Sequence, residues 1–430
     1  MDARVQWPAR PSVVMGPEDL KVMDDGRIAG AATARYARKK ETILAAATTI
    51  LNRQGVRGMT LADVAASVGL NTTSVTYYYR KKDDLAAACF MRGLERFEAM
   101  VEQAAVEASP AARIVKFLDL YLDLNRRVRM GEATPLTSFA EIKALKEPLR
   151  GSVIGAFNDL FRRVRSFFDD PSLAHLDKRQ RNARTHLLME QVFWSGRWLR
   201  RYDVEDYGRV LERMSDILLK GLPAAHGAWA PRPLPDPTPL SPEGLEWRET
   251  FLVAATRLIN QRGYRGASVE EISAALNVTK GSFYHHHDDK DALVTECFER
   301  TFTVTRRSQL DARALPTDSW TQLVSTAAGL TSYQLSEHGP LLRASSLGAL
   351  PEPLRSDMAD GYMRGWQRFA SIISDGVADG SIRAVDASIA AHMINSMLNA
   401  AASLEAWVPG LQREEAADLF ARPLLTGLLS

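Results

Sequence analysis

The segment Glu41-Thr-Ile-Leu-Ala-Ala-Ala-Thr48 returns 208 residues later as Glu249-Thr-Phe-Leu-Val-Ala-Ala-Thr256. The match continues without a gap over residues 40–90 in the first copy and 248–298 in the second. A period of this length is far longer than the roughly 20 to 50 residues of a solenoid repeat. The sequence therefore predicts two complete copies of one domain, each with its own core.

The composition is that of an ordinary globular protein. The 430 residues are 46% hydrophobic and 25% charged, and no run of eighteen apolar residues suggests a membrane span. The first residues lack the apolar core and cleavage site of a secretory signal, so we expect a cytoplasmic protein. Cys89 and Cys297 occupy equivalent positions of the repeat, which favours inherited core thiols over a disulfide or a metal site.

Apolar residues recur at helical spacing in both copies, and no stretch sustains the alternation of a strand. Ile43, Leu44 and Ala47 illustrate the pattern in the first copy. The sequence therefore predicts an all-α protein with two tandem units. The longer amphipathic segments expected to be helices are 114–129, 143–168, 183–202 and 207–219 in the first unit, and 320–335, 354–377, 387–407 and 414–429 in the second.

Two segments interrupt this helical pattern. Residues 1–37 mix Pro, Gly and charged residues without periodicity, and are expected to form a mobile tail with a basic end. Seven prolines between residues 222 and 245 exclude helix and favour an extended polyproline conformation. At roughly 3.1 Å per residue, this linker could span about 70 Å. The two units are therefore free to lie side by side.

Each copy contains the pattern of a helix-turn-helix. Thr60-Leu-Ala-Asp63 and Ser268-Val-Glu-Glu271 each fit a capping box at a helix start. Gly69 and Asn277 follow seven residues that favour helix, and both suit a turn with positive φ. A further short helix begins at Asn71 or Thr279. Two short helices joined in this way form the motif whose second helix enters the major groove of DNA.

These residues resemble the amino-terminal domain of TetR-type bacterial transcriptional regulators. The second copy carries the family pattern closely and the first carries most of it, as shown by Gly263-Tyr264, Ser268, Val278 to His287 and Lys290 to Leu293, and by Gly55, Thr60, Gly69-Leu70, Asn71 to Tyr79 and Lys82 to Leu85. The resemblance implies a helix-turn-helix domain followed by a larger helical domain that binds a ligand and pairs subunits through its last two helices. The helices expected to pair are 183–201, 207–219, 387–407 and 414–429.

The resemblance divides the chain into six parts. They are a basic-ended tail (1–37), a first helix-turn-helix domain (38–84), a first helical ligand-binding and pairing domain (85–221), a proline-rich linker (222–245), a second helix-turn-helix domain (246–292) and a second helical domain (293–430).

The resemblance, together with the basic run before the first helix, also assigns DNA contacts. Hydroxyl, amide and basic side chains of the motif would contact base edges or phosphates. Thr76 stands where the family has a phosphate-binding Tyr, and the neighbouring Tyr77 is expected to replace it. Tyr79 and His287 stand where the family has Phe. The expected DNA contacts are Arg38, Lys39, Lys40, Thr60, Asn71, Thr72, Thr73, Thr76, Tyr77 and Lys82 in the first copy, and Ser268, Thr279, Lys280, Gly281, Ser282, Tyr284, His285 and Lys290 in the second.

Charge separates the two copies. Residues 34–92 contain ten Lys or Arg against four Asp or Glu, whereas residues 246–300 contain seven against nine. Binding to the phosphate backbone depends on positive charge. We therefore expect the first copy to hold DNA more strongly, unless its basic run is only a solvated tail.

The effector site is less defined by the sequence. The resemblance implies a small-molecule effector, and Tyr121, Trp194, Tyr333 and Trp366 are candidates to line cavities for an apolar or aromatic compound, with plain core packing as the alternative. The consecutive histidines 285–287 point about 100° apart on a helix, so no metal site is expected. No cofactor is expected either.

The predicted function is a DNA-binding regulator, by family default a repressor, whose two units form a pseudo-dimer on an asymmetric operator. Pairing between chains stays open. In one alternative, only the first helix-turn-helix binds double-stranded DNA and the second serves pairing. A helical enzyme is disfavoured because the sequence lacks a phosphate loop, a nucleophile elbow and a metal-ligand cluster.

Overall fold

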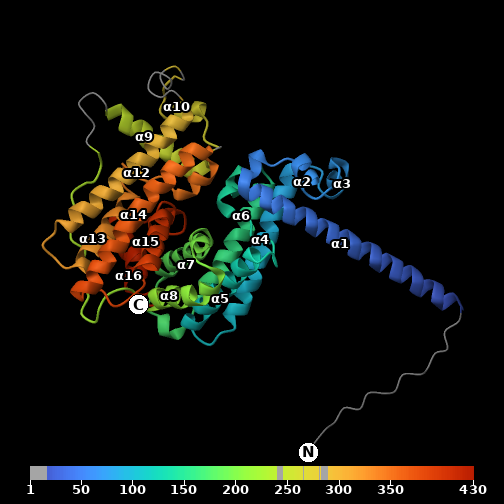
Figure 1. Ribbon diagram of the computed structural model, residues 1–430, viewed down its shortest axis with the longest axis horizontal. Coiled ribbons are helices and arrows are strands. Elements are labelled where there is room, and N and C mark those ends of the chain that lie inside the picture. The colour runs from blue at the N-terminus through green and yellow to red at the C-terminus, as the bar shows by residue number, and fades with distance from the viewer. Residues whose placement is uncertain (1–16, 240–245, 265, 280, 282–288) are drawn as a thin grey trace, which may run out of the picture.

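The structure is a computed structural model that describes residues 17–239, 246–264, 266–279, 281 and 289–430. Every element of regular secondary structure in this part of the chain is a helix or a helical turn (Figure 1), which confirms the all-α prediction. Within the same residues, no helix is both long and apolar enough to cross a membrane.

The first unit is a helix-turn-helix domain followed by a larger helical domain. Helices α1 to α3 and the start of α4 form the smaller domain, and α4 continues into the larger one (Figure 1). The elements are α1 (Pro17–Gly58), α2 (Leu61–Ser67), α3 (Thr72–Tyr78), α4 (Lys82–Ala105), α5 (Pro110–Arg129), the 3₁₀ turn η1 (Phe139–Ala144), α6 (Leu149–Arg165), α7 (Lys178–Trp198) and α8 (Tyr207–Lys220).

The second unit repeats this order. Each of its described elements has a counterpart in the first unit, with η6 matching η1 and the final turns matching α8. The elements are α9 (Glu246–Arg262), α10 (Val269–Ala275), α12 (Lys290–Arg313), α13 (Ser319–Tyr333), η6 (Ala344–Ala349), α14 (Glu352–Asp379), α15 (Ala387–Ala401), the π-helical turn η9 (Ala417–Ala421) and α16 (Arg422–Thr426).

Three expected boundaries were wrong. Helix α1 begins at Pro17, so residues 17–37 are helical where a mobile tail was expected. The expected helix 143–168 is interrupted: η1 ends at Ala144 and α6 starts only after Pro148. The physical reason is that a proline disfavours the helical conformation in the residue before it. The expected helix 414–429 is present as a continuous helical run, but it ends at Thr426. It contains the π-helical turn η9 just before Pro423, a residue that lacks the N–H of a regular helical bond.

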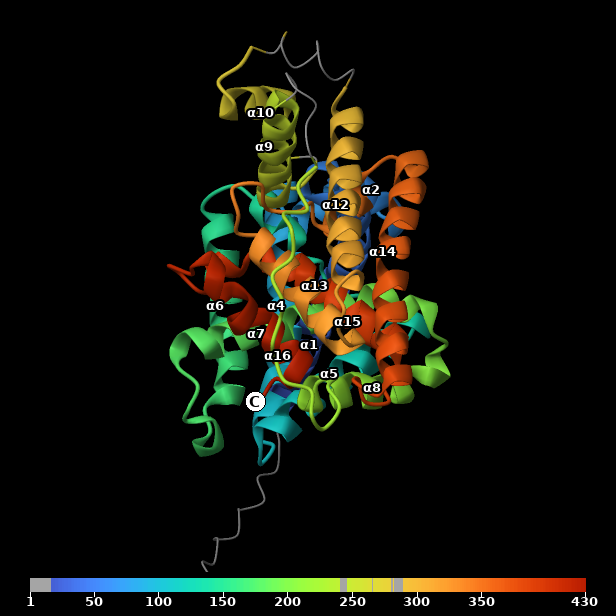
Figure 2. The same ribbon diagram turned by 90° about the vertical axis from the view of Figure 1, so that its left-hand side faces the viewer.

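The helices expected to pair do pack against one another, within one chain. Helix α7 contacts α15 and η9, and α8 contacts α15 and α16, so each helix of one unit touches both of its counterparts. In Figure 2, α7, α15 and α16 lie near the centre of the molecule and α8 lies toward its lower edge. Polar bonds cross the contact. The side-chain amide of Gln191 donates to the carbonyl of Met393 at 3.0 Å, and Nε2 of His186 lies 3.0 Å from the carbonyl oxygen of Ala400.

The linker is bound along the second unit. Residues 222–239 contain no helix. The indole of Trp320 on α13 donates to the carbonyl of Ala228 at 2.8 Å, and the backbone N–H of Arg232 donates to the hydroxyl of Ser325 on the same helix at 2.8 Å. The chain thus returns along α13 before it enters α9.

Candidate nucleic-acid interface

The caps of the first motif helix differ between the two copies. In the first, Thr60 Oγ1 accepts from the N–H of Asp63 at 3.1 Å, and its hydroxyl donates to the Asp63 carboxylate at 2.7 Å. In the second, Ser268 accepts from Glu271 N–H at 3.2 Å, and Glu271 accepts from Ser268 N–H at 3.1 Å. The reciprocal capping box is therefore confirmed for the second copy and wrong for the first, where Asp63 takes the hydroxyl instead of the backbone.

The turn and the recognition helix follow the sequence closely. Gly69 has φ of 66° and Asn277 has φ of 56°, as their residue types predict. Asn71 caps α3 with its side-chain oxygen, which accepts from the N–H and the hydroxyl of Ser74, both at 2.7 Å. Thr72 and Thr73 lie exposed in the first turn of α3. The hydroxyl of Thr76 donates to the Thr73 carbonyl at 2.9 Å.

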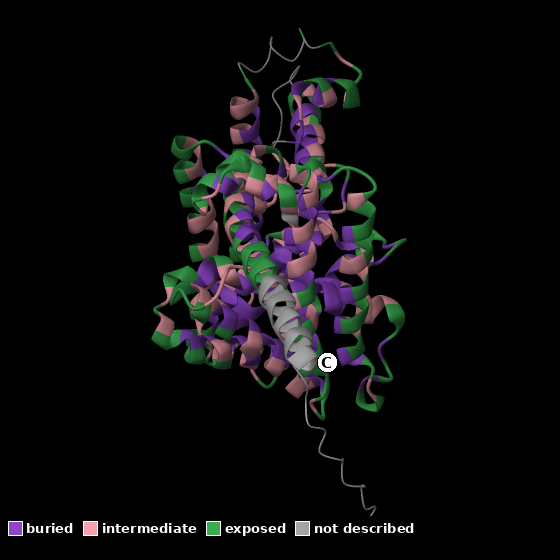
Figure 3. Cartoon of the chain, turned by 90° about the vertical axis from the view of Figure 1, so that its right-hand side faces the viewer, coloured by how far each residue is buried: buried purple, intermediate pink, exposed green. Residues whose placement is uncertain are grey.

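The basic segment of α1 lies against the end of α3. The ring of Tyr36 packs 6.2 Å from that of Tyr77 and 4.8 Å from that of Tyr78. Tyr77 is 75% exposed, and residues 35–40 are all exposed, as is visible along α1 in Figure 3. Arg38, Lys39 and Lys40 therefore share one surface with the exposed side of α3. We call the surface formed by residues 35–40, Tyr77, Arg80 and Lys81 the basic face.

The sequence analysis missed Tyr36, Arg80 and Lys81. Arg80 and Lys81 are exposed between α3 and α4, and neither side chain forms an ion pair within the described part of the chain. A comparison of the two copies could have identified Arg80 and Lys81, because the second copy has Asp288 and Asp289 at the equivalent positions.

The two expected phosphate contacts at the start of the next helix bind the protein's own backbone. Lys82 Nζ donates to the carbonyl of Arg57 at 2.9 Å. Lys290 Nζ donates to the carbonyl of Tyr264 and lies 4.2 Å from the centre of its ring, and burial lowers the pKa of Lys290. In both units, the lysine therefore holds the end of the preceding long helix; contact with DNA remains a prediction.

Three described arginines of the second copy are paired with glutamates. Arg248 pairs with Glu296 at 2.8 Å, and Arg262 and Arg300 pair with Glu271 and Glu249. Thr279 and Gly281 are exposed. Four of the expected DNA contacts lie outside the described residues, namely Lys280, Ser282, Tyr284 and His285. The rest of the histidine run 285–287 lies outside them too.

Each DNA-binding domain is tied to its helical domain by an asparagine. Asn52 on α1 donates to the carbonyl of Leu136 at 2.8 Å and accepts from the N–H of Ser138 at 2.8 Å. Asn260 on α9 forms the same pair of bonds with Leu341 and Arg343, at 2.9 and 3.0 Å. These two-way amide bonds fix α1 and α9 to the loops before η1 and η6.

The four expected effector residues each contact neighbouring side chains of the protein. Tyr121 is buried and stacks on Phe97 at 5.6 Å, Trp194 donates to Glu190 at 3.0 Å, Tyr333 accepts from Arg300 at 2.9 Å, and Trp366 stacks on His392 at 4.6 Å. Their contacts are those of core and interface packing. The thiols of Cys89 and Cys297 are also buried, without a disulfide, as predicted.

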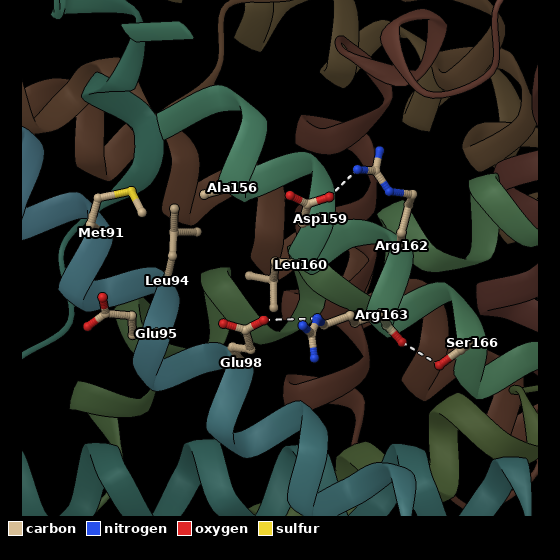
Figure 4. Close-up of a pocket in the computed structure, with 10 residues that line it drawn as sticks. All are labelled: Met91, Leu94, Glu95, Glu98, Ala156, Asp159, Leu160, Arg162, Arg163 and Ser166. Atoms are coloured by element: carbon tan, nitrogen blue, oxygen red, sulfur yellow. Dashed lines mark hydrogen bonds and ion pairs between the residues drawn. The ribbon is translucent and has the colours of Figure 1, made fainter. Parts of the chain in front are cut away.

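A surface groove of about 500 Å³ lies between α4 and α6 of the first unit. Figure 4 shows Met91 and Leu94 on one wall facing Leu160 on the other, with charged side chains along the rim. Arg163 pairs with Glu98 at 2.9 Å across the groove. None of the four expected effector residues lines it.

Comparison with known proteins matches the two motif regions to one family. The sequence profile of the family described as "Bacterial regulatory proteins, tetR family" matches residues 43–89 and 251–297. The chain is similar to the HTH-type transcriptional repressor DhaR of Mycobacterium sp. strain GP1, with 29% identity over 32% of this chain and 70% of DhaR. It is also similar to the HTH-type transcriptional repressor KstR2 of Rhodococcus jostii strain RHA1, with 29% identity over 33% of this chain and 72% of KstR2.

Among solved structures, the chain resembles AibR in complex with isovaleryl coenzyme A and operator DNA. The identity is 22% and the TM-score 0.35, and the match covers 42% of this chain and all of AibR. DhaR and KstR2 are both named as transcriptional repressors, which is not an enzymatic function.

Proposed function

Because the chain belongs to the TetR family of bacterial regulatory proteins, with two amino-terminal domains of that family in tandem, we propose that it is a repressor whose two units act as a pseudo-dimer on an asymmetric operator. It is a DNA-binding transcriptional regulator, as its relatives are. We place its action in the cytoplasm, where the DNA of a bacterium lies.

The packing of α7 and α8 on α15 and α16 is the observation that carries the pseudo-dimer. A two-fold interface uses the same surface on both partners, and here equivalent helices of the two units meet. In a dimeric helix-turn-helix protein, such an interface sets the recognition helices about one DNA turn apart. A single chain would then provide both helix-turn-helix domains that contact the operator, which we call the two reading heads. The two heads need not bind the same half-site sequence.

Electrostatics support unequal contributions from the two heads. The first copy gathers Arg38, Lys39, Lys40, Arg80 and Lys81 on its basic face, whereas Arg248 and Arg262 of the second copy are paired with glutamates. Phosphate contacts supply most of the non-specific affinity. The first head would therefore supply most of the affinity, and the second would add selectivity.

We further propose that a small apolar or aromatic molecule releases the protein from DNA. The aromatic interior of the first unit supports such an effector, since Phe97 is surrounded by the rings of Phe117, Tyr121, Phe139 and Phe193 within 6.5 Å. A ligand would have to displace some of these rings.

A footprint on the DNA upstream of the protein's own gene, with the protein-to-DNA ratio measured in the same samples, tests the proposal. We expect one chain to protect two unlike half-sites separated by about one helical turn. Protection of one half-site per chain, or of two identical half-sites by two chains, would refute the pseudo-dimer.

The second candidate function keeps DNA binding only in the first unit, with the second unit serving pairing. The pairing of Arg262 with Glu271 of α10 favours it. Replacing Lys280 and Tyr284 by alanine distinguishes the two. An unchanged footprint would support the pairing role, whereas loss of one half-site would support two reading heads.

A further inference from the structure

A cleft of about 1090 Å³ lies where the two helix-turn-helix domains approach each other. Its walls come from three regions: the end of α1 with the start of α4, the segment from η1 into α6, and the end of α9 with the turn that follows. It therefore touches both DNA-binding domains and the first helical domain. It shares no lining residue with the groove between α4 and α6.

The contact between the two units forms one end of this cleft. Element η1 packs on both α1 and α9, and η6 packs on α1. Glu141 of η1 lies so close to two glycines that a Cβ would come within 2.7 Å of its carboxylate at Gly55 and 3.4 Å at Gly263. Both glycines have positive φ, 70° and 73°. The ends of α1 and α9 thus meet over one side chain.

The lining is strongly basic. Six cationic side chains face two carboxylates, Asp83 and Glu147, and the cations are Arg57, Lys82, Lys143, Lys146, Arg150 and Arg262. Glu147 is already occupied, because it accepts from Arg150 at 2.9 Å and from the N–H of Gly151 at 3.0 Å. These bonds also hold its pKa below the ordinary value.

Two of the cations have no counter-charge. Within the described residues, Lys143 and Lys146 form neither an ion pair nor a side-chain hydrogen bond. Both side chains are exposed. Desolvation, and next the guanidinium of Arg343, lower the pKa of Lys143, so this amine lies in a positive environment. Uncompensated positive charge of this kind attracts anions and is relieved by them.

We propose that the cleft binds a small polyanion that carries phosphate groups, and that the bound anion links the two DNA-binding domains. Its volume is that of a small-molecule site, and its unpaired charge comes from Lys143 of η1 and from Lys146, which lies between η1 and α6. Arg262 of α9 lines the same cleft. If it exchanges its pair with Glu271 for the anion, the anion joins the first helical domain to the second helix-turn-helix domain. The spacing of the heads then depends on its concentration.

The test is calorimetric titration of the full chain with inorganic tripolyphosphate, a defined polyanion. We expect saturable binding of one tripolyphosphate per chain. The variant Lys143→Gln with Lys146→Gln should bind at least ten-fold more weakly. The matched control, Arg80→Gln with Lys81→Gln, removes the same number of charges from the basic face and should retain the affinity of the unmodified chain.

Three results would overturn the proposal: no saturable binding, equal affinity in the Lys143/Lys146 variant, or loss of binding in the Arg80/Lys81 variant, which would place the anion on the basic face. Circular dichroism and the melting temperature of each variant show whether it is folded; if the Lys143/Lys146 variant is not, Lys146→Gln alone replaces it, with the same ten-fold criterion.

Operator affinity of the same variants without tripolyphosphate keeps this proposal separate from the DNA-binding function. The Lys143/Lys146 variant should bind DNA within about two-fold of the unmodified chain. If it instead loses DNA binding together with anion binding, the operator backbone occupies the cleft and the small-anion proposal is wrong. Failure of all variants and of the unmodified chain to bind DNA would refute the proposed function alone.

Discussion

At the residue scale, the repeat has preserved an ion pair but changed its surroundings. Glu41 pairs with Arg92, and the equivalent Glu249 pairs with Arg300. The first pair is open to water, with Glu41 56% exposed, whereas Arg300 is 2% exposed and Glu249 15%. Arg300 also donates to Tyr333 at 2.9 Å. Equivalent ion pairs of the two copies therefore lie in different dielectric environments. Each pair can serve as the control when the other is mutated.

We predict that Glu249→Gln destabilises the anchoring of α9 by about 3 kcal/mol, because it leaves a buried guanidinium uncompensated. Glu41→Gln should cost less than about 1 kcal/mol at α1, because water replaces the lost partner. Hydrogen exchange of the α9 and α1 amides, which reports local opening free energies, measures both. Equal effects would show that the buried pair carries no additional stability.

His392 predicts how stability depends on pH. Its ring stacks between Trp198 at 4.9 Å and Trp366 at 4.6 Å. Burial, and secondarily Arg201, lower its pKa to about 3, while an unfolded histidine has a pKa near 6.5. The unfolded chain thus binds more protons between these values, so stability falls as pH drops from about 6.5 toward 3.

We expect the free energy of unfolding to fall by about 1–2 kcal/mol between pH 7 and pH 5 through this group, and His392→Gln to remove that part. Urea unfolding at both pH values measures it. Asp379 and Glu415, with pKa values of about 2, remain ionised across this window and do not contribute. A His392→Gln variant with an unchanged pH dependence would contradict the assignment.

At the scale of elements, the basic face makes a quantitative prediction. Arg80→Gln with Lys81→Gln should reduce the slope of log affinity against log salt by about 2, because each lost phosphate contact removes roughly 0.9 from it. Fluorescence anisotropy of a labelled operator at several salt concentrations measures the slope. Arg126→Gln with Arg127→Gln, the same charge change on α5, is the control and should leave it unaltered.

The helices and the turns were predictable because their causes are local. Periodicity predicts α5 and α8, and the residue types at Gly69 and Asn277 predict their positive φ. The bonds of Asn52 could not be predicted, since its partner Leu136 is 84 residues away. The same applies to Lys82. The sequence motif predicts that Lys82 binds a DNA phosphate, but in the folded chain its amine donates to the carbonyl of Arg57. Local rules identify an element, whereas its partners depend on the tertiary fold.

At the scale of the whole molecule, both units are held by contacts that do not need the linker. Phe161 stacks on Trp407 of the other unit at 3.9 Å, and Arg179 forms a bidentate pair with Glu415 at 3.1 and 2.8 Å. Arg184 donates to the carbonyls of Leu428 and Ser430 at 2.9 and 2.7 Å. Because these contacts lie within one chain, pairing between chains would have to replace them.

We therefore predict that the chain sediments as a monomer, and that its two halves stay together after cleavage at a protease site inserted among residues 240–245. The buried stacking and ionic contacts hold them, while the linker only raises their effective concentration. Analytical ultracentrifugation before and after cleavage measures both. Trp407→Ala should promote separation of the cleaved halves, because it removes a large, partly buried ring from the contact. Dimers of the intact chain, or halves that separate without this change, would mean that the units pair between chains.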